Sequence, residues 1–141
     1  MGESNFEVEV RAVVPEDFKK NLEIKGAKTT ENRPYRDEYY KPAGQNWDPE
    51  KINMRLRARQ GNDFVEVFFS KVEYLEKQGI KIKKSMHPGG KVRIFSGSEK
   101  TARELLKDCG FEYWFTVNKP YCAVYRLNGV EFPLEQVDDL G

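Results

Sequence analysis

Apolar and charged side chains alternate residue by residue along most of this chain of 141 residues. In Phe6–Val14 the alternation sets Glu7, Glu9 and Arg11 against apolar neighbours. Successive side chains of a β-strand point to opposite faces, so a period of two predicts short strands with one apolar face each. The expected strands are Phe6–Val14, Tyr35–Lys41, Ile52–Gln60, Phe64–Lys71, Gly79–Ser85, Lys91–Phe95, Tyr113–Lys119, Tyr121–Leu127 and Val130–Leu134.

Two segments carry helix signals instead. Pro15-Glu16-Asp17 suits the first turn of a short helix, and Ser98 is placed to cap a second helix over Glu99–Cys109, with a glycine after each. Asn128-Gly129, between two alternating runs, is a strong signal for a tight hairpin. The pattern predicts a single α+β domain over residues 1–141. Its strands, about eight in number, would form a strongly curved sheet or a closed antiparallel β-barrel or tunnel with two or more flanking helices.

Composition and charge narrow the classes of partner. The net charge is +1, from 24 basic and 23 acidic residues, so bulk electrostatics disfavour nucleic acid and membrane partners. No apolar run approaches the length of a membrane span, and the N-terminus lacks the apolar run of a signal peptide. Cys109 and Cys122 have no metal-like spacing, which favours a reduced, cytoplasmic protein. The single histidine, His87, lies in a Pro-Gly-Gly turn, which argues against histidine-based catalysis.

Charge of one sign gathers on single strand faces. Arg55, Arg57 and Arg59 follow one another on one face of the Ile52–Gln60 strand. Any one such face taken alone is most simply the solvated side of a half-buried sheet. Three arginines in series repel one another, however, unless an anion lies among them, and the guanidinium fork suits phosphate. Glu7 and Glu9 share a strand face, as hard ligands of Mg²⁺ or Mn²⁺ would. If these faces turn inward, the sheet encloses a charged tunnel.

Several motifs occur in a fixed order along the chain. They are Glu7-Val8-Glu9-Val10-Arg11, Asp37-Glu38-Tyr39-Tyr40, Met54-Arg55-Leu56-Arg57, Phe69-Ser70-Lys71, Val117-Asn118-Lys119 and Leu134-Glu135-Gln136-Val137. They resemble the ExExK, DxYY and LRxR motifs, a phosphate-binding lysine segment, the approach to KxR, and the LDxV stretch of one superfamily. This is the CYTH, or triphosphate tunnel metalloenzyme, superfamily, which includes class IV adenylyl cyclases, thiamine triphosphatases and inorganic tripolyphosphatases.

The resemblance implies a tunnel that binds a triphosphate together with Mg²⁺ or Mn²⁺. It implies metal ligation by Glu7, Glu9 and Glu135, and a catalytic role for Glu7, Glu9 and Arg11. The phosphate-binding residues implied are Arg11, Arg55, Arg57, Lys71, Lys81 and Lys119. The substrate would be ATP, thiamine triphosphate or tripolyphosphate, and the reaction cyclisation or phosphohydrolysis.

The chain also departs from the superfamily pattern. Arg11 replaces the lysine of ExExK, Glu135 replaces the aspartate of LDxV, and Tyr121 takes the arginine position of KxR. Lys71 shares strand parity with apolar residues, so it reaches the cationic face only through a bulge. The chain stops at Gly141, where relatives continue into a strand with an ExE pair, so we expect a C-terminally incomplete domain.

Four functional readings remain open. The leading one is a metal-dependent triphosphate enzyme, and the second is a non-catalytic module that binds a polyanion in the same fold. A plain structural domain and a single-strand nucleic-acid binder are less favoured. Exposed strand edges would also permit a homodimer.

Overall fold

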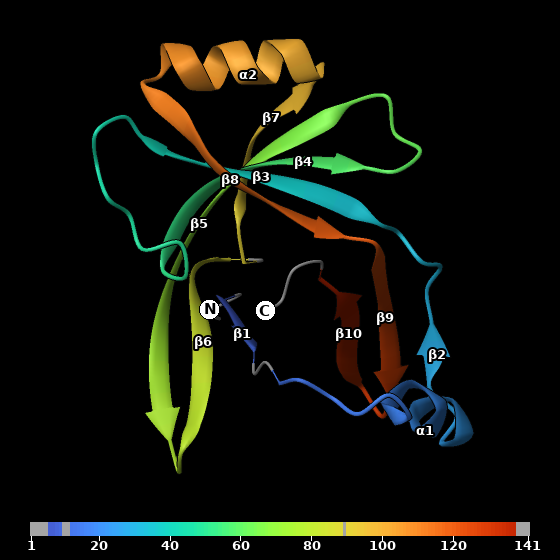
Figure 1. Ribbon diagram of the computed structural model, residues 1–141. Helices are drawn as coiled ribbons and strands as arrows, with labels where there is room; N and C mark the ends of the chain where they lie inside the picture. The colour runs from blue at the N-terminus through green and yellow to red at the C-terminus, as the bar shows by residue number, and fades with distance from the viewer. Residues whose placement is uncertain (1–5, 10–11, 89, 138–141) are drawn as a thin grey trace, which may run out of the picture.

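The computed structural model (Figure 1) describes residues 6–9, 12–88 and 90–137, with residues 6–9 described by their backbone alone. These residues form two helices, α1 (Phe18–Ile24) and α2 (Glu99–Asp108), and ten strands. The strands are β1 (Phe6–Glu9), β2 (Lys28–Thr29), β3 (Tyr35–Pro42), β4 (Ile52–Arg59), β5 (Val65–Lys77), β6 (Ile80–Pro88), β7 (Val92–Gly97), β8 (Phe111–Lys119), β9 (Tyr121–Leu127) and β10 (Val130–Gln136). No helix of the described residues is long and apolar enough to cross a membrane.

All strand pairings are antiparallel, and they form two sheets. The larger has seven strands in the order β1-β6-β5-β4-β3-β8, with β7 paired to β5, and the smaller has the order β10-β9-β2. Only Pro120 separates β8 from β9, so the chain passes directly from the larger sheet into the smaller one. In Figure 1 the long β5–β6 hairpin and β1 form one side of an arch, and β9 and β10 form the other.

The antiparallel α+β architecture is the one that the alternation predicts. Within the described ranges, no pairing joins β1 at one end of the larger sheet to β10 of the smaller sheet. The strands therefore form an arch here, and closure into a complete tunnel stays a prediction.

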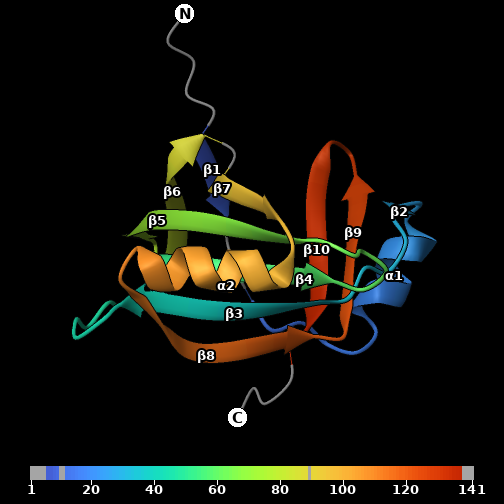
Figure 2. The ribbon, with the colours of Figure 1, turned by 90° about the horizontal axis from the view of Figure 1, so that it is seen from above.

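Each side of the arch has its own apolar core. The main core lies between α2 and the larger sheet, where Leu56 and Val67 are fully buried and pack with Ala102 and Leu106 of the helix. Figure 2 shows α2 lying over the larger sheet, roughly along β3 and β4, so the helix covers this face of the sheet and not the opposite one. The second core packs Leu22 of α1 against β9.

The helix α2 begins where the sequence predicts. Ser98 has an extended backbone, and its hydroxyl accepts a hydrogen bond from the Thr101 amide at 3.1 Å, which satisfies one of the first free N–H groups of the helix. The buried stripe of the helix runs through Ala102 and Leu106.

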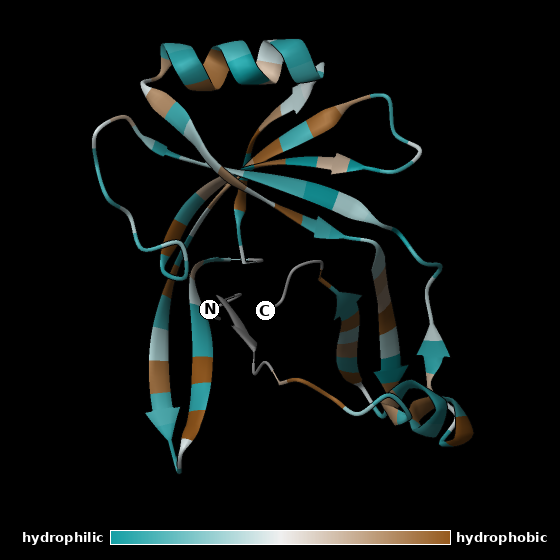
Figure 3. Ribbon diagram, in the orientation of Figure 1, coloured by the Kyte–Doolittle hydropathy of each residue, from teal (hydrophilic) through white to brown (hydrophobic). Residues whose placement is uncertain are grey.

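The turns explain where strand lengths agree with the sequence pattern and where they differ. Asn128 and Gly129 have φ of 52° and 78°, the turn expected of an Asn-Gly pair. Gln78 and Gly79 adopt the same conformation, with φ of 54° and 76°, and this turn lets β5 run on to Lys77 rather than end at Lys71. Figure 3 shows hydrophobic and hydrophilic bands alternating along this β5–β6 hairpin.

Candidate anion-binding site

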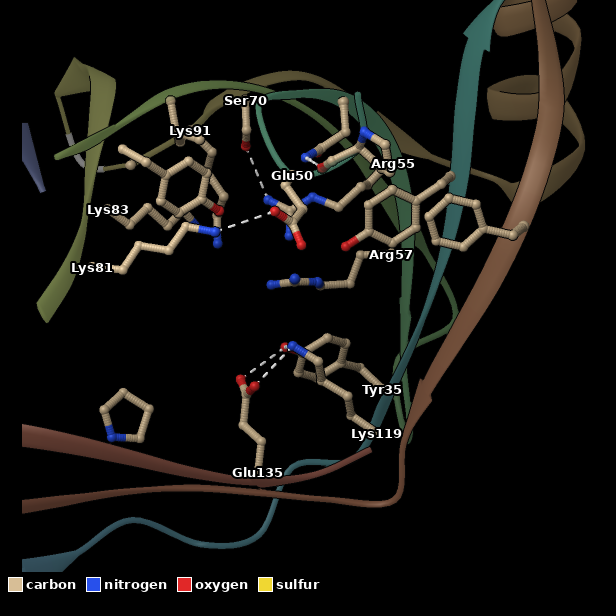
Figure 4. A pocket seen from close by; sticks show the side chains of 18 residues that line it. Tyr35, Glu50, Arg55, Arg57, Ser70, Lys81, Lys83, Lys91, Lys119 and Glu135 are labelled. Carbon is tan, nitrogen blue, oxygen red and sulfur yellow. Dashed lines mark hydrogen bonds and ion pairs between the residues drawn. The ribbon is translucent and has the colours of Figure 1, made fainter. Parts of the chain in front are cut away.

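A cavity of about 590 Å³ lies on the inner side of the arch, against the face of the larger sheet that α2 does not cover. Strands from both sheets line it, together with the segment before β4 and the turn before β7. Its lining contains two carboxylates, Glu50 and Glu135. It also contains six cationic side chains, Arg55, Arg57, Lys81, Lys83, Lys91 and Lys119. Figure 4 shows these cations projecting into one space from opposite walls.

Strand parity explains why the arginines point inward. Leu56 lies fully buried beneath α2, so its neighbours Arg55 and Arg57 project from the other face of β4. On β5 the even-numbered residues Ser70 and Val72 line the same cavity. The two strands therefore present one polar face to the interior of the arch.

Asp37, on the neighbouring strand β3, contacts both arginines of β4. It stands opposite Arg57 in the β3–β4 register, and its side chain is 0% exposed. Arg57 Nε donates to Asp37 Oδ1 and Arg57 Nη2 to Asp37 Oδ2, both at 2.8 Å. Arg55 Nη1 lies 3.6 Å from Asp37 Oδ2, and Arg55 Nη2 donates to Ser70 Oγ at 3.0 Å.

This pairing sets the electrostatics of the cavity wall. Burial is the largest single effect and lowers the pKa of Arg57, but the hydrogen bonds and negative charge of Asp37, together with the nearby Tyr35 and Tyr39, outweigh it and raise that pKa. One buried carboxylate thus lies beside two guanidinium groups. It balances only one of their two positive charges, so the cavity wall keeps an excess of positive charge. The Nε atom of Arg55 is buried and has no hydrogen-bond partner among the described residues.

Lys119, Tyr35 and Glu135 link the two sheets at the far wall. Lys119 Nζ donates to Glu135 Oε2 at 2.8 Å and to the Tyr35 hydroxyl at 2.9 Å. The Tyr35 hydroxyl donates to Glu135 Oε1 at 3.1 Å. Burial and the nearby Glu135 carboxylate raise the pKa of Tyr35 above its usual value, against an opposing effect of Arg57, so the phenol stays a donor.

Aromatic rings form another part of the lining. Tyr39 and Phe115 are stacked, with ring centroids 4.5 Å apart and an interplanar angle of 13°. Tyr74 lies on β5, where Lys81 Nζ sits 4.2 Å from the centre of its ring, and Lys81 also pairs with Glu50 at 3.4 Å. The cavity therefore combines a cationic surface with a flat apolar one.

The structure brings together five of the residues singled out from the sequence. Arg55, Arg57, Lys81, Lys119 and Glu135 all line the cavity.

Lys71 does not line it. The β4–β5 register runs without a shift through Lys71, so the bulge that would turn this side chain inward is absent, and Lys71 is exposed on the opposite face of β5.

The predicted acidic strand is only partly described. Glu9 is paired in register with Lys83, a cavity residue, and Glu7 lies two residues earlier on β1. The side chains of Glu7 and Glu9 lie outside the described part of the structure, as does the whole of Arg11.

Sequence reasoning did not identify Asp37, Lys83, Lys91 and the aromatic wall as parts of the site. Asp37 could have been found, because an antiparallel hairpin between β3 and β4 sets it opposite the arginine face. Lys83 and Lys91 were visible as charged strand positions, but only the fold shows that they share a cavity with β4.

The described residues alone do not make a metal site. Among them, no three histidine, cysteine, aspartate or glutamate side chains cluster as metal ligands would. Glu135 is bound by Lys119 and Tyr35, and Glu50 pairs with Lys81. A divalent cation here would therefore need ligands from outside the described residues, where the predicted ligands Glu7 and Glu9 have their side chains.

Comparison with known proteins identifies the fold but no family. No protein-family model matches the chain, and no curated protein matches it. A solved structure of a conserved hypothetical protein from Pyrococcus furiosus aligns with 96% of this chain and 74% of its own, at 20% identity and a TM-score of 0.66.

Two proteins from Pyrococcus horikoshii OT3 align similarly. PH1012 has a TM-score of 0.63 at 23% identity, and PH1819 has 0.61 at 17%; each alignment covers 96% of this chain and 72% of theirs. A structure from Bacillus halodurans, provisionally called an adenylate cyclase, aligns at 10% identity over 98% of this chain and 81% of its own. Its TM-score of 0.42 is too low to support an argument about this protein. The chain thus shares its fold with these three archaeal proteins.

Proposed function

We propose that this protein binds a triphosphate-bearing small molecule in the cavity of the arch and acts on it with Mg²⁺ or Mn²⁺. The reaction would be that of a class IV adenylyl cyclase or of a triphosphate phosphohydrolase. The observation that carries the proposal is the set of six cationic side chains around one cavity whose described lining holds only two carboxylates. Both carboxylates are already paired with lysines, and the buried Asp37 is paired with Arg57, so the described lining keeps an excess of positive charge that an anionic ligand would balance.

The chemistry of the lining suits a chain of phosphates. Arg57 is held by Asp37 in one orientation, so little rotamer freedom is lost when its guanidinium contacts a phosphate. Lys81 and Lys83 lie on the opposite wall and would neutralise further phosphate oxygens. Fixed cations also stabilise charge that develops on the phosphates during transfer.

In this proposal Glu7, Glu9 and Glu135 are the ligands of the metal ion. A divalent ion held there would polarise a phosphorus–oxygen bond and neutralise phosphate charge. Arg11, from the same strand, would add a phosphate contact. In this proposal the arch closes into a tunnel around the ligand.

One observation favours a second function. Glu135 is engaged by Lys119 and Tyr35, which favours a non-catalytic module that captures a polyanion without metal. In that case the same cations bind tripolyphosphate, and no bond is broken.

One set of measurements tests both functions. Isothermal titration calorimetry with tripolyphosphate, ATP and thiamine triphosphate, in EDTA and in Mg²⁺ or Mn²⁺, reports binding. Release of phosphate or pyrophosphate and formation of cyclic AMP report turnover. Failure of all three ligands to bind contradicts both functions, whereas tight binding in EDTA without turnover in either metal supports the capture module.

Matched variants locate the binding face. Lys81→Met removes an inward lysine and should weaken tripolyphosphate binding about tenfold or more. Lys71→Met removes an exposed lysine from the opposite face of the neighbouring strand and should leave binding unchanged. Equal effects of the two substitutions would contradict the assignment of the cavity.

The aromatic wall separates the three candidate ligands. A nucleoside or thiamine ring can stack beside Tyr39 and Phe115, whereas tripolyphosphate has no ring. Phe115→Ala should therefore weaken ATP or thiamine triphosphate while leaving tripolyphosphate affinity near the wild-type value. A variant that binds all three ligands like wild type would favour an inorganic substrate.

The metal ligands are tested by Glu7→Gln. Loss of Mg²⁺- or Mn²⁺-dependent turnover, with tripolyphosphate binding in EDTA retained, is the expected result. Metal-dependent turnover at the wild-type rate would exclude Glu7 from the metal site. Gel filtration of the same protein with and without ligand tests the homodimer.

A further inference from the structure

Lys91 occupies an unusual position among the cations of the cavity. It follows a turn closed by a 3.1 Å hydrogen bond from the Gly90 amide to the His87 carbonyl, immediately before β7. Its half-buried side chain lines the cavity with Arg55 and Arg57, and its Nζ lies 4.6 Å from the ring centre of Phe68. Figure 4 shows Lys91 on the same side of the cavity as Ser70.

Among the described residues, Lys91 has no carboxylate partner, in contrast to several other cations of the cavity. Arg57 is paired with Asp37, Lys81 with Glu50, and Lys119 with Glu135. Within the part of the chain that the structure describes, Lys91 makes no hydrogen bond or ion pair, and its ammonium group makes a cation–π contact with the ring of Phe68. A partly buried ammonium without a counter-charge is costly, and a bound anion would remove that cost.

The surroundings of Lys91 act on its charge in one direction. Burial, followed by Arg57, Arg55 and Arg59 of β4, lowers the pKa of Lys91 to about 8, against a smaller opposing effect of Asp37 on β3. The other charged groups lining the cavity are Glu50 before β4, Lys81 and Lys83 of β6, Lys119 of β8 and Glu135 of β10. On β1, Glu9 pairs in register with Lys83, and its side chain lies outside the described residues.

We propose that Lys91 contacts the bound phosphate chain directly, and that anion binding is linked to the uptake of one proton by its amine. The proton comes from solvent to Nζ, and no other bond forms or breaks. This inference rests on the proposed function only in taking the ligand to be a polyphosphate anion.

The linkage sets a distinct pH dependence of affinity. Below about pH 8 Lys91 is already charged in the ligand-free protein, so binding takes up little or no proton. Above that pH each binding event must also protonate the amine, so affinity falls by up to about tenfold per pH unit.

Cyclic trimetaphosphate is the probe of choice, because it carries three phosphate charges and no group that titrates between pH 6 and pH 10. Calorimetric titrations at pH 7 and pH 9, each in two buffers of different ionisation enthalpy, give the number of protons taken up. We expect the number to rise from near zero at pH 7 toward one at pH 9, with weaker binding at pH 9.

Three variants assign the proton to Lys91. Lys91→Met should bind about 10- to 100-fold more weakly at pH 7 and take up no proton at pH 9. Lys91→Arg keeps a charge that does not titrate, so it should bind at both pH values without uptake. Lys81→Met is the matched control: its affinity falls, but its proton uptake remains that of wild type.

The possible outcomes separate this inference from the proposed function. If trimetaphosphate and tripolyphosphate both fail to bind wild type, the proposed function and the inference fall together. If they bind, and Lys91→Met and Lys91→Arg take up the same number of protons as wild type, the inference alone is overturned. Wild-type affinity of Lys91→Met at pH 7 would likewise remove Lys91 from the contact surface.

Discussion

The pairing of Asp37 with Arg57 shows how one residue serves both fold and site. Both side chains are almost completely removed from water, so neither charge could be buried without the other. Asp37 also lies 3.6 Å from Arg55, so the same carboxylate stabilises two neighbouring cations of β4. The positive wall of the cavity thus depends on an acid that no ligand needs to touch.

Asp37→Asn tests that dependence. The amide leaves Arg57 charged and buried without its counter-ion, so the free energy of unfolding should fall by about 3–5 kcal/mol. Urea denaturation followed by far-ultraviolet circular dichroism measures the change. As a control, Glu112→Gln removes the exposed partner of Lys41, and because that pair is screened by solvent the free energy of unfolding should change far less. Similar losses for the two variants would show that burial of the pair does not matter.

Lys91 predicts a pH dependence of stability in the ligand-free protein. Its pKa is lowered to about 8 in the folded state and stands near 10.5 in the unfolded chain. Between these values the unfolded state holds more protons, so this residue's contribution to the free energy of unfolding rises with pH. Below about pH 8 both states are charged, and the enclosed ammonium lowers stability.

The comparison with Lys91→Met isolates this contribution. The variant should be more stable than wild type at pH 7, and the difference should shrink between pH 8 and pH 10, by at most about 1.4 kcal/mol per pH unit. Urea denaturation at each pH gives the difference. Lys100→Met, on an exposed position of α2, should show no such trend. A Lys91→Met difference that stays constant across this range would contradict the lowered pKa.

At the scale of elements, α2 combines a capped start with a buried stripe. The Ser98 hydroxyl accepts from the Thr101 amide, so Ser98→Ala should lower the free energy of unfolding by about 1 kcal/mol. Ser96→Ala, two residues earlier and exposed on β7, is the control and should change stability by less than about 0.5 kcal/mol. Thermal unfolding of both variants measures the difference, and equal shifts would exclude the cap as its source.

The elements also show what a sequence can predict here and what it cannot. The Asn128-Gly129 hairpin and the Ser98-capped helix were predicted, because each depends on local backbone chemistry. The length of β5 was not, because glutamine is an uncommon first residue for the turn at Gln78-Gly79, and the last part of β5 is fixed by pairing with β6. The two-residue strand β2 exists through its pairing with β9, which no local pattern reveals.

The site divides in the same way. Arg55 and Arg57 were predicted as phosphate contacts from strand parity and the resemblance, and both line the cavity. Strand parity also predicted that Lys71 reaches the cationic face only through a bulge, and the β4–β5 register has no bulge there. Asp37 lies opposite the arginine face once β3 and β4 pair, whereas Lys91 needed the tertiary structure, because its role depends on the distance between β4 and the turn before β7.

At the scale of the whole molecule, the two sides of the arch depend on different contacts. The larger sheet has its own core under α2, whereas the smaller sheet packs around Leu22 and Tyr125 and joins the larger through the chain at Pro120. Across the cavity the sheets are also tied by Lys119, Tyr35 and Glu135. A ligand that binds these side chains would therefore stabilise the smaller sheet more than the larger one.

Glu135→Gln tests this division. The substitution removes the charge that balances Lys119, so amide hydrogen exchange should become faster in β9 and β10 and stay unchanged in β4 and β5. Tripolyphosphate should then restore part of the protection, because a phosphate can take the place of the carboxylate beside Lys119. The matched control is Glu131→Gln, at a residue of β10 like Glu135. It removes an exposed partner of Arg126 and should leave hydrogen exchange as in wild type. Faster exchange throughout both sheets of Glu135→Gln would show that the arch opens as one cooperative unit, and protection unchanged by tripolyphosphate would place the anion away from Lys119.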